Sequence, residues 1–179
     1  MTAMKFLLAI VLLFAQTQVF ADGPFRRDVP LAAYRFMECF TKRVEEEKGL
    51  VLVAKVADVD PCEDKITGFR LEFDFFGHPS IDDVRRLIIS VLDGFLNAIN
   101  TDQKIAPYLA TFPFTPEDVD IRIEFRTQEC DKFYPYLGNI AYVMAYDGRI
   151  VYNTLNSYNY HVERYKIESY GEAKYNLSR

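Results

Sequence analysis

The sequence predicts an α+β fold, a mainly antiparallel sheet with two amphipathic helices packed on one face and a short C-terminal helix. Three observations support this prediction. Two long segments repeat apolar residues at helical spacing, and several shorter segments alternate between apolar and polar residues. Their order along the chain is helix, strands, helix, strands and short helix. Because no repeat or linker interrupts this order, we expect residues 22–179 to form a single domain.

The first 21 residues have the pattern of a cleaved signal peptide. Lys5 gives a short positive start, residues 6–15 are apolar, and Ala21 ends the segment with a small side chain that fits signal peptidase. The apolar run is shorter than the roughly 20 residues that cross a bilayer comfortably. We therefore expect cleavage after Ala21, a secreted or periplasmic protein, and no stable membrane span after cleavage. A permanent N-terminal anchor is the alternative.

The first half of the remaining chain contains one helix and two strands by its apolar spacing. Residues 28–48 form an amphipathic helix that Gly49 ends, because glycine adopts the left-handed conformation of a helix stop. Residues 50–57 are Val-rich and predict a strand buried on both faces. Residues 66–76 alternate, which predicts a strand with one apolar and one charged face. The charged face carries Arg70, Glu72 and Asp74.

The middle of the chain contains the second long helix. Ser80 and Asp83 resemble a capping box, and the wide apolar stripe that follows predicts a helix from residue 81 to about residue 100. Residues 101–118 form a long, proline-containing connection, which we expect to be ordered by its own aromatic rings. These rings are Tyr108, Phe112 and Phe114. Residues 119–126 then alternate as a second clear strand, with Arg122 and Glu124 on its charged face.

The C-terminal part contains a predicted hairpin. Asp147-Gly148 is a strong two-residue turn signal inside residues 139–154. This turn places three pairs on one face of the hairpin. They are Tyr146 with Arg149, Met144 with Val151, and Tyr142 with Asn153. Residues 158–168 predict another strand, and residues 170–177 a short helix.

The charge balance excludes one class of partner. Lys5 is the only charged residue of the leader, so residues 22–179 keep 20 basic and 26 acidic side chains, a net charge of −6. An acidic domain lacks the long-range attraction to nucleic acid that a basic domain has. We therefore expect no nucleic-acid partner.

Three cysteines are present in a chain that we expect to enter an oxidising compartment. Cys62 and Cys130 lie in turn-like sequences, and we favour a disulfide between them. Cys39 lies beside the apolar stripe of the first helix, which is typical of a buried, small hydrophobic residue. The alternative is that all three thiols stay reduced.

No motif for catalysis, a metal or a cofactor is present. The sequence has no GxSxG elbow, no phosphate loop, and no His or Cys at metal-ligand spacing. We therefore predict no catalytic residue, no metal and no cofactor. The alternative is a small secreted or envelope hydrolase that uses a His/carboxylate or Cys/His site, with His78 or His161 as its histidine.

Tyrosine is concentrated in the C-terminal part, where ten of twelve tyrosines fall between Tyr134 and Tyr175. Tyrosine combines a flat apolar ring with a hydroxyl and loses little entropy on binding. We therefore predict an exported, non-enzymatic domain that binds protein, peptide or a small apolar ligand. Its surface is either an aromatic-rich sheet face or the cleft beside the proline-containing connection. The alternative is that the rings only cover the sheet and the core rim. The candidate face consists of Tyr142, Met144, Tyr146, Arg70, Glu72, Asp74, Arg122 and Glu124.

Overall fold

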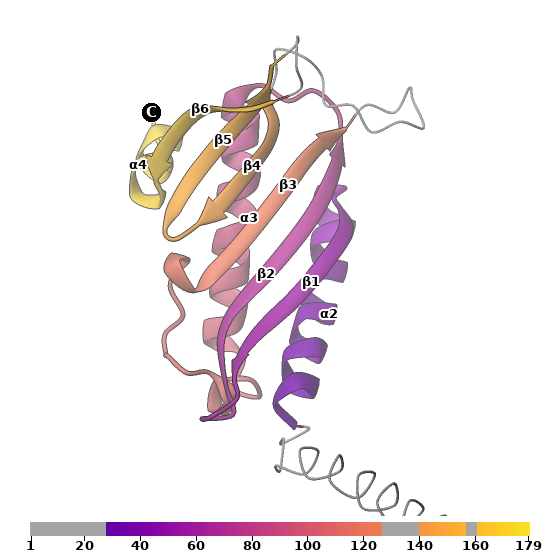
Figure 1. Ribbon diagram of the computed structural model, residues 1–179, viewed down its shortest axis with the longest axis vertical. Coiled ribbons are helices and arrows are strands. Elements are labelled where there is room, and N and C mark those ends of the chain that lie inside the picture. Colours follow the sequence, from indigo (N-terminus) through magenta and orange to yellow (C-terminus); the bar gives the residue numbers. More distant parts are fainter. Residues whose placement is uncertain (1–27, 127–139, 157–160) are drawn as a thin grey trace, which may run out of the picture.

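The computed structural model describes residues 28–126, 140–156 and 161–179. Within these ranges, six strands form one sheet, and helices pack against one of its faces (Figure 1). The helices are α2 (Asp28–Lys48), α3 (Ile81–Thr101) and α4 (Tyr170–Leu177), with short 3-10 turns η1 (Ala106–Tyr108) and η2 (Pro116–Asp118). The strands are β1 (Val51–Asp60), β2 (Lys65–Phe76), β3 (Val119–Arg126), β4 (Ile140–Tyr146), β5 (Arg149–Leu155) and β6 (Val162–Ser169).

The strands lie in the sheet in the order in which they occur in the sequence. Every neighbouring pair is antiparallel except β2 and β3, which are parallel because α3 returns the chain to the end of the sheet where β2 began. The predicted α+β class with a mainly antiparallel sheet is therefore confirmed. The predicted hairpin is also confirmed, since Tyr146 pairs with Arg149, Met144 with Val151, and Tyr142 with Asn153.

Aromatic rings join the two long helices to the sheet. Phe95 of α3 is fully buried, and its ring packs edge-on against Phe36 and Phe40 of α2, with centroids 5.3 and 5.0 Å apart. Phe69 of β2 meets the same ring at 5.3 Å. Edge-to-face pairs of this kind add about 0.5–1.5 kcal/mol each beyond the burial of their area. The contact of the three elements through one ring fixes the helices on a single face of the sheet.

The ends of α3 are held by side-chain hydrogen bonds. Ser80 and Asp83 form the predicted capping box. In the last turn of the helix, the Asn100 side-chain amide donates to the backbone oxygen of Phe114 at 2.9 Å and accepts from its backbone nitrogen at 2.7 Å. Phe114 is buried as expected, but Phe112 is 61 % exposed. The long connection is therefore anchored through Phe114 and Asn100, and our expectation that Phe112 also packs is wrong.

Two expectations about burial need correction. We predicted that β1 is buried on both faces, but among the described strands it lies at one edge of the sheet and has β2 as its single neighbour. As a result, Val51, Val53 and Val56 are 46, 53 and 47 % exposed. We also predicted that Cys39 is buried, but its thiol is exposed. The core-facing stripe of α2 passes through Phe36, Met37 and Phe40 and leaves Cys39 outside it.

A buried ionic cluster attaches β6 and α4 to α3. The Glu168 carboxylate of β6 is nearly inaccessible, and it accepts from the Arg85 guanidinium of α3 at 2.8 Å and from the Tyr152 hydroxyl at 2.5 Å. Lys166 and Asn176 donate to its other oxygen at 2.8 and 3.0 Å. Burial by itself raises the pKa of Glu168, but Arg85, Lys166 and Tyr152 outweigh it and lower the pKa from 4.5 to about 2.

This cluster predicts how stability depends on pH. A carboxyl group with a lowered pKa in the folded state stabilises the fold above its unfolded pKa, and this contribution disappears as pH falls from about 4.5 to about 2. In Glu168→Gln, we expect the fall in unfolding free energy over this pH range to be smaller by about 3 kcal/mol. Urea titrations at a series of pH values measure this. Glu46→Gln, an exposed position on α2, is the control and should keep the pH dependence of the original chain.

Candidate functional site

One face of the sheet has no helix packed on it in the described part of the chain. α2, α3 and α4 all lie on the other face, and Figure 1 looks onto the uncovered side, with α2 and α3 behind the strands. We call the uncovered side the open face. Strand alternation brings polar and aromatic side chains to this face, because the apolar partners on each strand point into the core.

The strand register brings the predicted surface residues together. In the β2–β3 pair, Arg70, Glu72 and Asp74 lie beside Asp120, Arg122 and Glu124. In the β3–β4 pair, Arg122 lies beside Met144, and Glu124 beside Tyr142. Tyr146 extends this row to the turn that ends β4. All eight candidate residues therefore lie on the open face of three adjacent strands.

The half of this face toward the C-terminal end of β3, the upper half in Figure 1, has most of its acids paired with arginines. Arg126 of β3 contacts Asp74 at 2.6 Å and Glu124 at 3.0 Å, and Arg122 pairs with Glu124. The Arg122 guanidinium also lies 4.4 Å from the centre of the Tyr142 ring. A hollow of about 180 Å³ lies among these side chains. Sequence analysis omitted Arg126, although alternation along β3 places it on the same face as Arg122.

The lower half of the face is acidic. A hollow of about 220 Å³ opens there, and its carboxylates come from β1, η2, β3 and the β4–β5 turn. We call it the acidic hollow, and its charged and aromatic lining is Asp58, Glu117, Asp118, Asp120, Asp147 and Tyr146. Arg70 forms its salt bridge with Asp58, through contacts of 2.5 and 3.2 Å. The candidate face predicted from the sequence includes Tyr146 and none of these acids, because they come together only when the strands assemble.

The neighbouring carboxylates of the acidic hollow disfavour the ionisation of Asp120. Burial raises the pKa of Asp120, and the nearby Asp58 and Asp147 raise it further, against the opposing effect of Arg70. Within the described residues, Asp120, Asp147 and Glu117 form no salt bridge. The folded chain therefore holds more negative charge at this point than its own cations neutralise.

This crowding predicts that removing one charge stabilises the fold. A carboxyl group with a raised folded pKa weakens the fold once pH exceeds its unfolded pKa. We expect Asp120→Asn to increase the unfolding free energy at pH 7 by roughly 0.5 kcal/mol, a value that allows for screening by solvent. Below about pH 3 the gain should disappear, because the original carboxyl group is then neutral in both states. Equal effects at pH 7 and pH 3, measured by urea unfolding, would contradict this account.

Apolar side chains border the acidic hollow on one side. Tyr146 is 53 % exposed, and Ile167 of β6, which pairs with Val151, is 43 % exposed. Tyr142, Met144 and Val151 are half-buried beside them. Other tyrosines of this region have a structural role, since Tyr152 lies in the core and the Tyr170 hydroxyl bonds to Asp93 of α3. The tyrosine-rich half therefore serves both the core and the open face.

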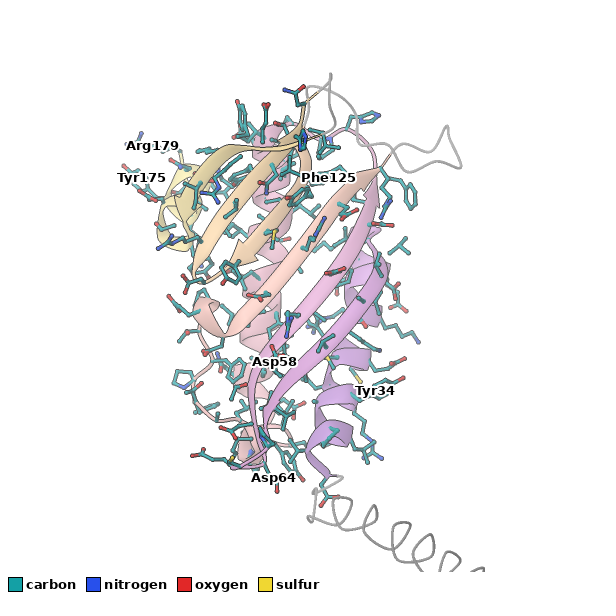
Figure 2. The ribbon with its side chains drawn as sticks, viewed as in Figure 1. Tyr34, Asp58, Asp64, Phe125, Tyr175 and Arg179 are labelled. Atoms are coloured by element: carbon teal, nitrogen blue, oxygen red, sulfur yellow. The ribbon has the colours of Figure 1, made fainter. Side chains whose placement is uncertain are left out.

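Of the candidate residues of the alternative hydrolase, Cys62 and His78 lie beyond opposite ends of β2. Cys62 lies in the β1–β2 turn and His78 follows the other end of β2, whose twelve residues span about 40 Å. Figure 2 illustrates this separation, with Asp64 of that turn at one end of the molecule and Phe125 near the other. Cys39, near the middle of α2, lines the groove between this helix and residues 102–108. No group of three potential metal ligands occurs within residues 28–126, 140–156 and 161–179.

The groove at Cys39 corresponds to the predicted cleft beside the proline-containing connection. It has a volume of about 590 Å³ and lies between the first half of α2 and residues 102–108. Its apolar lining includes Leu31, Phe36 and Ile105. Cys130, the predicted disulfide partner of Cys62, lies outside the described residues, and so does the predicted leader. No described helix is both long and apolar enough to span a bilayer.

No family model matches the chain, and no curated protein or solved structure gives a significant match.

Proposed function

We propose that this chain is an exported, non-enzymatic binding domain, and that its open face recognises a protein or peptide partner. The observation that carries the proposal is the composition of the open face. An exposed tyrosine, half-buried apolar side chains and unneutralised carboxylates lie together on this face, with no described α-helix over them. Contiguous surfaces of this kind on soluble domains are typical of interaction sites.

The shape of the open face favours a polypeptide over a small molecule. Its two hollows have volumes of about 180 and 220 Å³, below the roughly 300–1,000 Å³ of sites that enclose small ligands. Tyrosine at the centre of such a surface contributes strongly to protein–protein affinity, because its ring buries a large area at little entropic cost. The groove beside α2 is the alternative surface, and its larger volume suits a small apolar ligand.

Export is part of the proposal and has a direct test. If residues 1–21 are a cleaved leader, protein recovered from outside the cytoplasm begins at Asp22. Mass spectrometry of the N-terminal peptide measures this. A chain that retains Met1 and is recovered from the cytosol would contradict export and the expected Cys62–Cys130 disulfide.

A photo-crosslinking experiment tests which surface binds. A benzophenone side chain is introduced in place of Tyr146 on the open face, Tyr34 in the groove, or Tyr175 on α4, and the protein is expressed in its native host. Tyr34 and Tyr175 lie on opposite sides of the molecule (Figure 2), and both are more than half exposed. We expect a specific crosslinked protein from position 146 and none from positions 34 and 175.

Other outcomes of this experiment lead to different conclusions. A crosslink from position 34 alone would transfer the function to the groove, and the same adducts from all three positions would indicate non-specific contact. With the partner identified, Tyr142→Ala combined with Tyr146→Ala should weaken binding by about tenfold or more, as measured by calorimetry. Unchanged affinity would contradict the role of the open face.

A further inference from the structure

We propose that the partner segment on the acidic hollow is basic and places a lysine or arginine side chain against the Tyr146 ring. This inference rests on the proposed function and adds the chemistry of the partner. Three features of the open face support it. They are the excess of carboxylates, the exposed Tyr146 ring beside them, and the Arg122 guanidinium that lies over the Tyr142 ring elsewhere on the same face.

The acidic hollow has more carboxylates than nearby guanidinium groups, which favours binding of a cation from outside the domain. Five carboxylates line it, whereas the open face supplies two nearby guanidinium groups, Arg70 and Arg149. Arg70 is already paired with Asp58, and Arg149 lies on the far side of Tyr146, opposite it in the hairpin. The upper half of the face differs, since Arg122 and Arg126 there pair with Asp74 and Glu124, and among its described residues only Glu72 keeps a carboxylate without a salt bridge. The negative charge that remains is thus concentrated in the lower half.

Tyr146 provides the second element of the site. On the upper half, the Arg122 guanidinium lies over the ring of Tyr142, 4.4 Å from the ring centroid. Within the described residues no cation lies over the Tyr146 ring, although this ring is 53 % exposed and borders Asp120 and Asp147. A cation over a tyrosine face is attracted by the negative face of the ring, and the flanking carboxylates attract the same cation. The lower half therefore has the acids and the ring of such an arrangement, and the partner would supply the cation.

A polypeptide fits these features better than a free ion. The described residues contain no cluster with metal-ligand geometry, and the apolar side chains of Met144, Val151 and Ile167 continue from Tyr146 across β4, β5 and β6. A peptide that alternates basic and apolar side chains can contact both regions at once. Electrostatic attraction of this kind mainly raises the association rate and excludes acidic competitors.

A pair of model peptides tests the inference without knowledge of the natural partner. The probes are the capped pentapeptides KFKFK and EFEFE, titrated into the isotope-labelled chain and followed by NMR. We expect KFKFK to give saturable shifts of backbone amides around Tyr146 and Asp120, and EFEFE to give none there. In Asp120→Asn/Asp147→Asn, affinity for KFKFK should fall about tenfold, the effect of losing two partly screened charges. Asparagine also tolerates the positive φ of 50° at position 147, so the turn is kept.

The matched control is Glu46→Gln/Glu47→Gln, which removes the same charge from exposed positions near the end of α2. It should change affinity for KFKFK less than twofold, and Tyr146→Phe should retain most of the affinity that Tyr146→Ala loses. Equal effects of the two double variants, shifts located elsewhere, or equal binding of EFEFE would overturn the inference. A crosslinked partner with an acidic contact segment would overturn it too and leave the proposed function intact. Absence of any crosslink at position 146 would instead remove the proposed function.

Discussion

The packing of α2 and α3 against β2 through the Phe95 ring is the contact on which the rest of this structure depends. Phe36, Phe40 and Phe69 surround that ring at 5.0–5.3 Å, and all four side chains are buried. Protein interiors are close-packed, so neither helix can shift against the sheet without opening a cavity. Both long helices are therefore confined to one side of the sheet, and α4 joins them there through Asp93 and Glu168. The open face is the consequence of this asymmetry.

The buried carboxylate Glu168 and the surface carboxylate Asp120 lie in opposite electrostatic environments. Glu168 has four hydrogen-bond donors around its two oxygens, and it stays ionised in the core because each oxygen is satisfied. Asp120 lies partly buried on the open face beside other acids, and Arg70 offsets them only in part. The first arrangement stabilises the fold and the second weakens it slightly. Residues that weaken a fold where packing does not require them are typical of binding sites.

The two halves of the open face differ in charge although the same strands form both. Salt bridges offset most of the charge in the upper half, whereas the lower half is strongly acidic. Along β3, the residues that face outward alternate between acid and base, from Asp120 to Arg126. Glu124 pairs with arginines of its own strand, whereas Asp120 lies beside further acids from η2 and the β4–β5 turn. The turn and η2 add negative charge at one end only. The proposed binding function and the proposed basic partner both rest on this difference.

The sequence by itself determined the type and order of the elements, because helical and strand periodicities reflect which side of each element faces the core. It also determined the β4–β5 register, through the two-residue turn at Asp147-Gly148, and the polar faces of β2, β3 and β4. Only the tertiary structure decided the parallel pairing of β2 with β3, the edge position of β1, and the exposure of Cys39. It alone brought Asp58, Glu117 and Asp147 around Asp120, since these residues are distant in the sequence. Periodicity reports the direction of a side chain relative to its own element, and a site made from several elements depends on which of them become neighbours.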